Sequence, residues 1–138
     1  MSDPRADVRY NEIDTKQITI EHDATIVYDI EEVGGSAQVG LAVSIESNGV
    51  VTLAGNGENV FGKLIKVEND GFCVVQYRGF MQLPGGDSAT LTAGLKIVGD
   101  LGAASAEGYI QAVSTQDTVS RGMIIDATDA TGVWVYLE

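Results

Sequence analysis

The stretch KVENDGFCVVQYRGFMQLPGG, residues 66–86, decides the fold more than any other part of the sequence. An Asn-Asp-Gly turn at residues 69–71 precedes twelve residues that are rich in apolar side chains, and Pro-Gly-Gly at 84–86 ends the run. Asn, Asp and Gly tolerate the positive φ angles that tight hairpin turns require. The stretch therefore predicts a hairpin turn that leads into one long β-strand, residues 72–83.

Both faces of this expected strand are apolar. Because side chains alternate along a strand, one face carries Cys73, Val75, Tyr77 and Met81, and the other carries Phe72, Val74 and Phe80. One face lines a core, and a 138-residue chain has few further elements to cover the other. We therefore expect the second face to meet another copy of the chain. The candidates for that interface are Phe72, Val74, Arg78 and Phe80.

The same alternating pattern extends outward from this strand through most of the chain. From Ile18 onward, short apolar segments recur between clusters of Gly, Asn and Asp, which is typical of an all-β sandwich or barrel. About nine strands are expected, and ten segments carry the pattern: 18–22, 25–30, 40–46, 50–54, 63–68, 72–83, 95–100, 109–114, 121–127 and 132–138.

Two turns and one short helical signal complete this pattern. Residues 39–53 and 61–83 each contain a turn that ends in Gly. We expect each segment to form a β-hairpin, and the two hairpins to be built alike. The helical signal is a single turn at 88–92. The fold class is therefore all-β: a small barrel of residues 18–138 in one domain, with at most one short helix.

Residues 1–17 differ from the rest of the chain. Charged and polar residues dominate there, and only Val8, Tyr10 and Ile13 offer apolar anchors. We expect an extended N-terminal arm. Such an arm can add its backbone to the exposed sheet edge of a partner while its apolar side chains enter pockets.

Composition excludes several classes of protein. Eight basic against twenty acidic residues give a net charge of -12, which repels a phosphate backbone, so we expect no nucleic-acid partner. A single cysteine cannot form an internal disulfide. No apolar run approaches the roughly 20 residues of a membrane span, and the N-terminus does not resemble a signal peptide. No membrane association is expected.

Residues capable of catalysis or metal binding are scarce. His22 is the only histidine and is expected in a turn, while Cys73 lies in an apolar strand typical of an inert buried thiol. Two acidic pairs were considered as metal ligands: Asp126 with Asp129, and Glu68 with Asp70. Neither pair has the spacing of a calcium loop, so we expect these residues to lie in turns. We expect no catalytic residues, no cofactor and no metal, and hence not an enzyme.

The order of several motifs resembles a known family. Residues 55–100, GNGENVFGKLIKVENDGFCVVQYRGFMQLPGGDSATLTAGLKIVGD, place a Gly-x-Gly loop, Val-Phe-Gly, an Asn-Asp-Gly turn, a Cys/Val/Gln strand and Leu-Pro-Gly-Gly in succession. GMIIDA and VWVYLE follow near the end, so the pattern covers roughly residues 37–138. This order is similar to that of capsid decoration (cement) proteins of tailed bacteriophages.

The resemblance implies a fold and a function. It implies a β-barrel or β-tulip body that forms a homotrimer at three-fold and quasi-three-fold sites on the outer surface of a phage head. Such a trimer bridges neighbouring subunits of the major capsid protein and thereby stabilises the shell. The candidate capsid contacts lie in the arm and are Arg5, Val8, Arg9, Tyr10 and Ile13.

Two other functions remain open on the residues alone. The first is a carbohydrate-binding or adhesin module on a virion or cell surface, in which Trp134, Tyr136 and Tyr28 form a stacking platform for sugars. The second is a small hydrolase that uses a pair of the twenty acidic residues.

Overall fold

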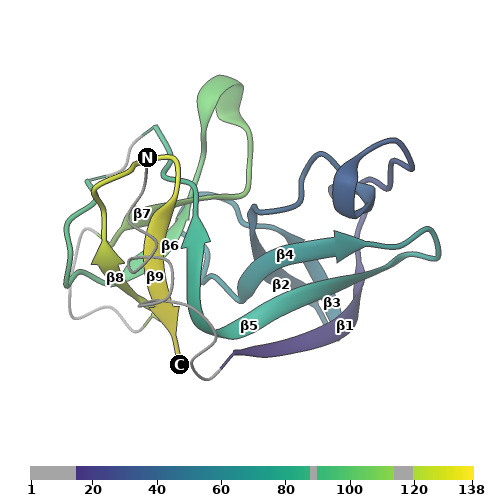
Figure 1. Ribbon diagram of the computed structural model, residues 1–138, viewed down its shortest axis with the longest axis horizontal. Helices are drawn as coiled ribbons and strands as arrows, with labels where there is room; N and C mark the ends of the chain where they lie inside the picture. Colours follow the sequence, from purple (N-terminus) through teal and green to yellow (C-terminus); the bar gives the residue numbers. More distant parts are fainter. Residues whose placement is uncertain (1–14, 88–89, 114–119) are drawn as a thin grey trace.

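The structure, a computed structural model, describes residues 15–87, 90–113 and 120–138. Nine strands are present in these ranges (Figure 1). They are β1 (Lys16–His22), β2 (Ala42–Ser47), β3 (Val50–Leu53), β4 (Gly62–Val67), β5 (Phe72–Leu83), β6 (Ile97–Asp100), β7 (Tyr109–Ala112), β8 (Met123–Asp126) and β9 (Val133–Leu137).

Five strands close into a small barrel. Their order is β1–β3–β2–β4–β5, and the first half of β5 pairs back onto β1, so the sheet closes on itself. All of these pairings are antiparallel except β1 with β3, which is parallel. The all-β barrel predicted from the alternating pattern is confirmed.

The second half of β5 leaves the barrel and starts another sheet. Residues Gly79 to Leu83 pair with β9, and β9 pairs with β8 (Figure 1). The bend has a local cause, because Gly79 adopts a φ of 104° and the Gln76 amide donates to the carbonyl oxygens of Arg78 and Phe80 at 3.3 and 3.1 Å. A two-stranded β6–β7 hairpin packs beside this second sheet.

Each half of β5 supplies side chains to a different core cluster. Cys73 and Val75 belong to the cluster inside the barrel, with Val43, Val51, Leu64 and Val67. Met81 and Leu83 belong to the second cluster, with Ile97, Ile110, Ile124 and Val135. The expected inward positions of Cys73, Val75 and Met81 are thus confirmed, and Tyr77 is half-buried at the bend between the clusters.

Both expected hairpins form. β2 and β3 pair antiparallel around Asn48 and Gly49, where Gly49 has a φ of 74°. β4 and β5 pair around residues 68–71, where the amide of Glu68 donates to the carbonyl oxygen of Phe72 at 2.9 Å.

The strand predicted at residues 25–30 is wrong. This segment is a loop, because side chains bind the backbone groups that a strand would use. Asp23 accepts the Thr25 amide at 3.0 Å, and Gln38 accepts the Val27 amide at 2.8 Å.

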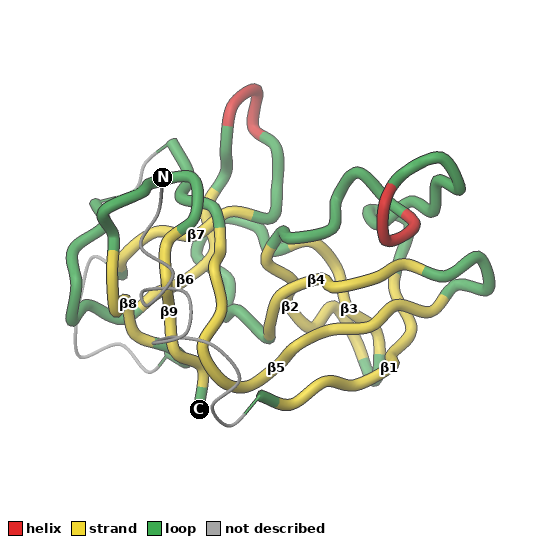
Figure 2. The backbone as a smooth tube through the Cα atoms, in the orientation of Figure 1, coloured by secondary structure: helices red, strands yellow, loops and turns green. Residues whose placement is uncertain are grey.

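Helical structure in the described residues is limited to two single 3-10 turns, Val33–Gly35 and Ala103–Ser105 (Figure 2). Of the helical turn expected at 88–92, residues 88 and 89 lie outside the described ranges, and residues 90–92 are not helical. Strand β1 begins at Lys16, two residues inside the segment assigned to the arm. No helix among the described residues is long and apolar enough to cross a bilayer.

Candidate interaction surface

The candidate contact residues fall into two groups. All five arm candidates, Arg5, Val8, Arg9, Tyr10 and Ile13, lie outside the described residues, so their role stays a prediction. The four candidates for the subunit interface lie in β5, but the bend divides them.

Phe72 and Val74 lie on the outer face of the barrel, opposite Glu21 and Thr19 of β1. Phe72 is 40% exposed. Phe80 lies beyond the bend, where its ring packs against Tyr136 of β9 with centroids 4.9 Å apart. Phe80 therefore does not share one surface with Phe72 and Val74, and Arg78 stands between them, opposite Lys16.

The three aromatic residues considered for sugar stacking are not brought together. Trp134 and Tyr136 share the outer face of β9, where both are half-buried. Tyr28 lies in the loop between β1 and β2, beside the β4–β5 turn. Figure 1 shows this loop at the opposite end of the molecule from β8 and β9. A platform built from all three does not form.

The groups considered for chemistry have structural roles. Burial, reinforced by Glu68, raises the pKa of the Cys73 thiol to about 11, so the nucleophilic thiolate is scarce at neutral pH. His22 lies opposite Gly71, and its Nδ1 is 2.8 Å from the carbonyl oxygen of Asp23. Within the described ranges, no three His, Cys, Asp or Glu side chains are grouped to hold a metal ion.

Three of the four acidic candidates, Asp70, Asp126 and Asp129, bind the backbone of turns, as expected. Asp126 accepts the amide of Thr128 at 2.9 Å, and Asp129 accepts the amide and the hydroxyl of Thr131 at 3.0 and 2.7 Å. Asp70 accepts the amide of Phe72 at 3.1 Å. Each carboxylate thus caps the backbone two residues ahead.

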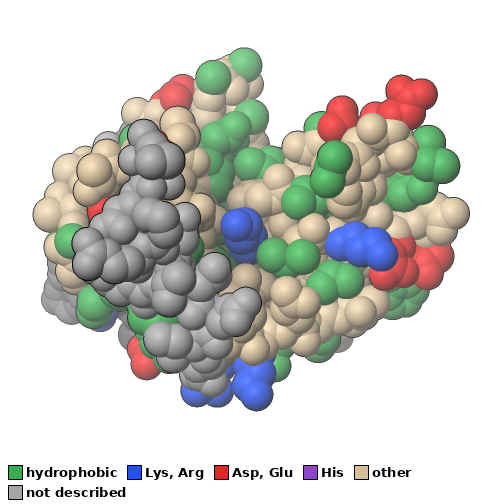
Figure 3. Space-filling model, in the orientation of Figure 1, with side chains coloured by type: hydrophobic (Ala, Val, Ile, Leu, Met, Phe, Trp, Pro, Cys, Tyr) green, Lys and Arg blue, Asp and Glu red, His purple; other side chains and the backbone are tan. Residues whose placement is uncertain are grey.

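Among the described residues, the most exposed large apolar side chains lie in the β1–β2 loop, residues 23–41. Val33 is 93% exposed, Ile30 80% and Val27 59%. Three carboxylates, Asp29, Glu31 and Glu32, lie between them in the sequence. Figure 3 shows hydrophobic and acidic side chains together at this end of the molecule. Exposed apolar groups clustered in this way mark interaction sites on proteins.

Hydrogen bonds hold this loop in one shape. The Gln38 amide nitrogen donates to the carbonyl oxygen of Thr25 at 2.6 Å, while its oxygen accepts the Val27 amide at 2.8 Å. The Asp29 amide donates to the carbonyl oxygen of Gly35 at 2.7 Å. The apolar side chains are therefore presented by an ordered backbone.

The loop is also docked onto the barrel. Gly35 has a φ of 88°, and a Cβ atom there would overlap the carbonyl oxygen of Val67 in β4. Between the loop and the β4–β5 turn lies an open pocket of about 450 Å³, lined by Tyr28, Ile30 and Glu32 on one side and by Lys66 on the other. A partner could thus contact the loop and the hairpin together.

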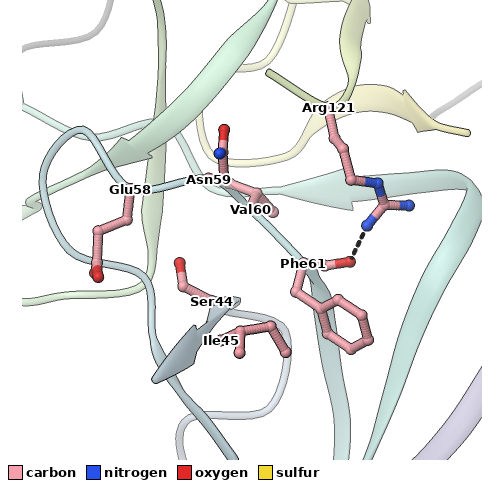
Figure 4. Close-up of a pocket in the computed structure, with 7 residues that line it drawn as sticks. All are labelled: Ser44, Ile45, Glu58, Asn59, Val60, Phe61 and Arg121. Atoms are coloured by element: carbon pink, nitrogen blue, oxygen red, sulfur yellow. Dashed lines mark hydrogen bonds between the residues drawn. The ribbon is translucent and has the colours of Figure 1, made fainter. Parts of the chain in front are cut away.

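A second pocket, the edge pocket, lies on the barrel wall. Its volume is about 410 Å³, and its lining residues are Ser44, Ile45, Glu58, Asn59, Val60, Phe61 and Arg121 (Figure 4). Ser44 and Ile45 come from β2, and Phe61 stacks on Tyr77 with ring centroids 5.8 Å apart.

Beside this pocket, Arg121 links the barrel to the second sheet through hydrogen bonds. Its guanidinium donates to the carbonyl oxygens of Phe61 at 2.7 Å, Tyr77 at 2.5 Å and Glu138 at 2.9 Å. Burial lowers the pKa of this guanidinium, and the Glu138 carboxylate opposes that effect. We call these hydrogen bonds the Arg121 clamp. The sequence analysis predicted neither the clamp nor the exposed loop. The loop does have a local signal, because acidic residues interrupt the apolar ones at 27–33.

Comparisons with protein-family models, with curated proteins and with solved structures found no match to this chain. The fold is therefore established by the structure itself. The family resemblance described above stays a prediction.

Proposed function

We propose that this chain is a capsid decoration protein. It binds the outer surface of a tailed-phage head as a homotrimer and stabilises the shell by bridging subunits of the major capsid protein. The observation that carries this proposal is the rigid β1–β2 loop, which exposes Val27, Ile30 and Val33 on a small all-β body. The motif order of residues 55–100 supplies the class of partner.

The physical argument rests on added contacts. A stable interface buries roughly 800 Å² on each partner, and a few well-packed apolar side chains dominate its energy. Three apolar side chains on an ordered loop lose little conformational entropy when a partner covers them. Three copies in a trimer then act through effective concentration, so modest single contacts give durable attachment.

Binding to undecorated phage heads tests this proposal. The full chain is expected to saturate at a copy number that matches the three-fold sites, and to sediment as a trimer alone or on the heads. The double variant Ile30→Ser, Val33→Ser removes two apolar anchors and is expected to weaken binding at least tenfold, because about 1.4 kcal/mol corresponds to a factor of ten. Deletion of residues 1–14, which leaves β1 intact, is expected to abolish binding by removing the arm.

Matched controls separate the parts of the proposal. Met123→Ser also removes an exposed apolar side chain, 45% exposed, but at the far end of the molecule, and is expected to bind as the full chain does. Unchanged affinity of the loop variant would remove the loop from the interface. Failure of the full chain to bind any heads would overturn the decoration function itself.

A further inference from the structure

Strand β2 has one partner along most of its length and a second along only its first two residues. It pairs with β3 from Val43 to Ser47, whereas its register with β4 covers Ala42 and Val43 alone. The amide of Phe61, which precedes β4, donates to the carbonyl oxygen of Val43 at 2.7 Å. Within the described ranges, no strand pairs with β2 beyond that point on the β4 side.

The backbone of Ile45 faces this open edge. Backbone groups of successive residues in an antiparallel strand point alternately to the two neighbouring strands, so Ile45 and Val43 present theirs to the same side. The side chain of Ile45 is 48% exposed, which shows that solvent reaches this position. An N–H and a C=O on such an edge form a template for one more strand.

The edge pocket adjoins this open edge and contains an unsatisfied polar group. Ser44 is 2% exposed, and its hydroxyl has no hydrogen-bond partner among the residues that the structure describes. Figure 4 shows this hydroxyl among the lining residues, on the same side as the Glu58 carboxylate and opposite Arg121. A buried hydroxyl without a partner costs about 1–3 kcal/mol, so a hydroxyl or amide that enters the pocket relieves that cost.

Charge favours a basic partner at this edge. Glu46 lies next to Ile45 in β2, Glu58 lines the pocket, and the whole chain carries a net charge of -12. The one cation among the lining residues, Arg121, interacts with the Glu138 carboxylate, and its guanidinium donates to three carbonyl oxygens. A segment with Lys or Arg on its solvent side therefore meets complementary charge.

We propose that the edge of β2 at Ile45, together with the edge pocket, is an acceptor site for an extended, basic peptide segment of a partner protein. The segment adds to β2 as a strand and pairs with the backbone of Ile45. A Ser, Thr or Asn side chain of the segment enters the edge pocket and exchanges a hydrogen bond with the Ser44 hydroxyl. This site is separate from the β1–β2 loop and does not depend on the identity of the partner as a capsid.

A designed peptide tests the site on the full chain. The probe is an acetylated, amidated peptide with four repeats of lysine-threonine, which places lysine and threonine on opposite faces of the added strand. It is titrated into isotopically labelled protein and followed by amide NMR. The Ile45 amide is expected to shift and to gain protection from hydrogen exchange. The same peptide N-methylated at alternate backbone nitrogens is expected to bind at least tenfold more weakly, and so is the peptide with glutamate in place of lysine. Equal affinity of the three peptides, or saturation without a response at Ile45, would overturn the proposal, as would no binding of the lysine peptide.

Variants of the protein locate the two parts of the site. Ile45→Pro removes the edge N–H and is expected to lower the affinity for the lysine peptide at least tenfold. Ile45→Val keeps this N–H and is expected to bind the peptide as tightly as the unsubstituted chain does. Ser44→Ala is expected to lower the affinity for the threonine-containing peptide several-fold. Its affinity for a peptide with valine at the threonine positions is expected to be unchanged. The N-methylated peptide and Ser44→Ala keep the test decisive if Ile45→Pro does not fold. Full affinity of Ser44→Ala for the threonine peptide would remove the edge pocket from the site.

Discussion

At the scale of single residues, short polar side chains organise the exit from β1. The Asp23 carboxylate accepts the amide and the hydroxyl of Thr25 at 3.0 and 2.5 Å. The Thr25 hydroxyl also lies 3.0 Å from that of Thr52 and accepts the amide of Leu53 at 3.1 Å. One acidic residue thus fixes the point where the chain leaves the barrel and begins the β1–β2 loop.

This arrangement predicts a pH dependence of stability. Burial acts to raise the pKa of Asp23, but hydrogen bonds from Thr25 and Thr52 outweigh it, so the pKa is lowered on balance. A carboxyl whose pKa is lower in the folded than in the unfolded chain stabilises the fold above the unfolded pKa, and this stabilisation is lost as pH falls through the folded pKa. We expect Asp23→Asn to lower the free energy of unfolding by about 1 kcal/mol at pH 6, a modest figure because the side chain is partly exposed.

Denaturant unfolding of both proteins from pH 6 down to about pH 2.5 measures the effect. The difference between them is expected to shrink once the pH falls below the ordinary Asp value of about 3.9, and to vanish at the acid end. Glu46→Gln is the control for the loss of one negative charge. A difference that stays constant over the whole range would show that the Asp23 charge contributes nothing.

At the scale of elements, the strands were predictable and the β1–β2 loop was not. Strands β4 and β9 alternate between buried and less buried side chains, and β2, β3 and β5 are apolar segments next to turns that contain Gly. The local sequence is therefore enough to predict these strands. Residues 25–30 alternate in the same way, but their backbone is bound by Asp23 and by Gln38, which lies 11 residues beyond Val27. Contacts over such a distance are not encoded in local periodicity.

The bend of β5 was not predicted either, because the local sequence pattern does not mark it clearly. The apolar pattern of Phe72–Leu83 continues through the bend, and only the position of Gly79 marks it. The open edge of β2 likewise depends on where β4 begins, and the Arg121 clamp joins residues up to 60 positions apart. Candidate surfaces built from such contacts could not be found by inspecting one segment at a time.

Docking of the β1–β2 loop onto β4 predicts a localised effect at Gly35. Gly35→Ala places a Cβ against the carbonyl oxygen of Val67 and forces a left-handed conformation on alanine, which alone costs about 1–2 kcal/mol. The loop is expected to lift from β4. Hydrogen exchange at the Asp29 amide, which donates to the Gly35 carbonyl oxygen, measures this and is expected to accelerate at least tenfold.

Gly49→Ala is the matched control for this variant. Gly49 also has a positive φ, 74°, but a Cβ there meets no atom of the described residues within 4 Å. It is expected to lower stability by about 1 kcal/mol and to leave exchange at Asp29 unchanged. Normal protection of Asp29 in Gly35→Ala would show that the close approach to Val67 does not position the loop.

At the scale of the whole molecule, β5 connects the two hydrophobic core clusters, because it contributes side chains to both. Its first half lies in the barrel cluster and its second half in the other cluster, while Arg121 ties the junction by binding carbonyl oxygens on both sides. Unfolding either cluster removes half of the pairing of the same strand. The two clusters are therefore expected to unfold together, as one domain.

Cavity variants in the two clusters test this coupling. Leu64 in the barrel cluster and Leu83 in the second cluster are both fully buried, so Leu64→Ala and Leu83→Ala are each expected to cost about 2–5 kcal/mol and to lower Tm by roughly 10 °C. Thermal unfolding is followed by far-UV circular dichroism and by fluorescence of Trp134 in β9, with Val33→Ala, at a 93% exposed position, as the control. Because the clusters share β5, both probes are expected to report one transition at one midpoint in each variant. A low-temperature transition in Leu64→Ala that Trp134 does not sense would mean that the barrel unfolds alone and that β5 transmits no stability across its bend.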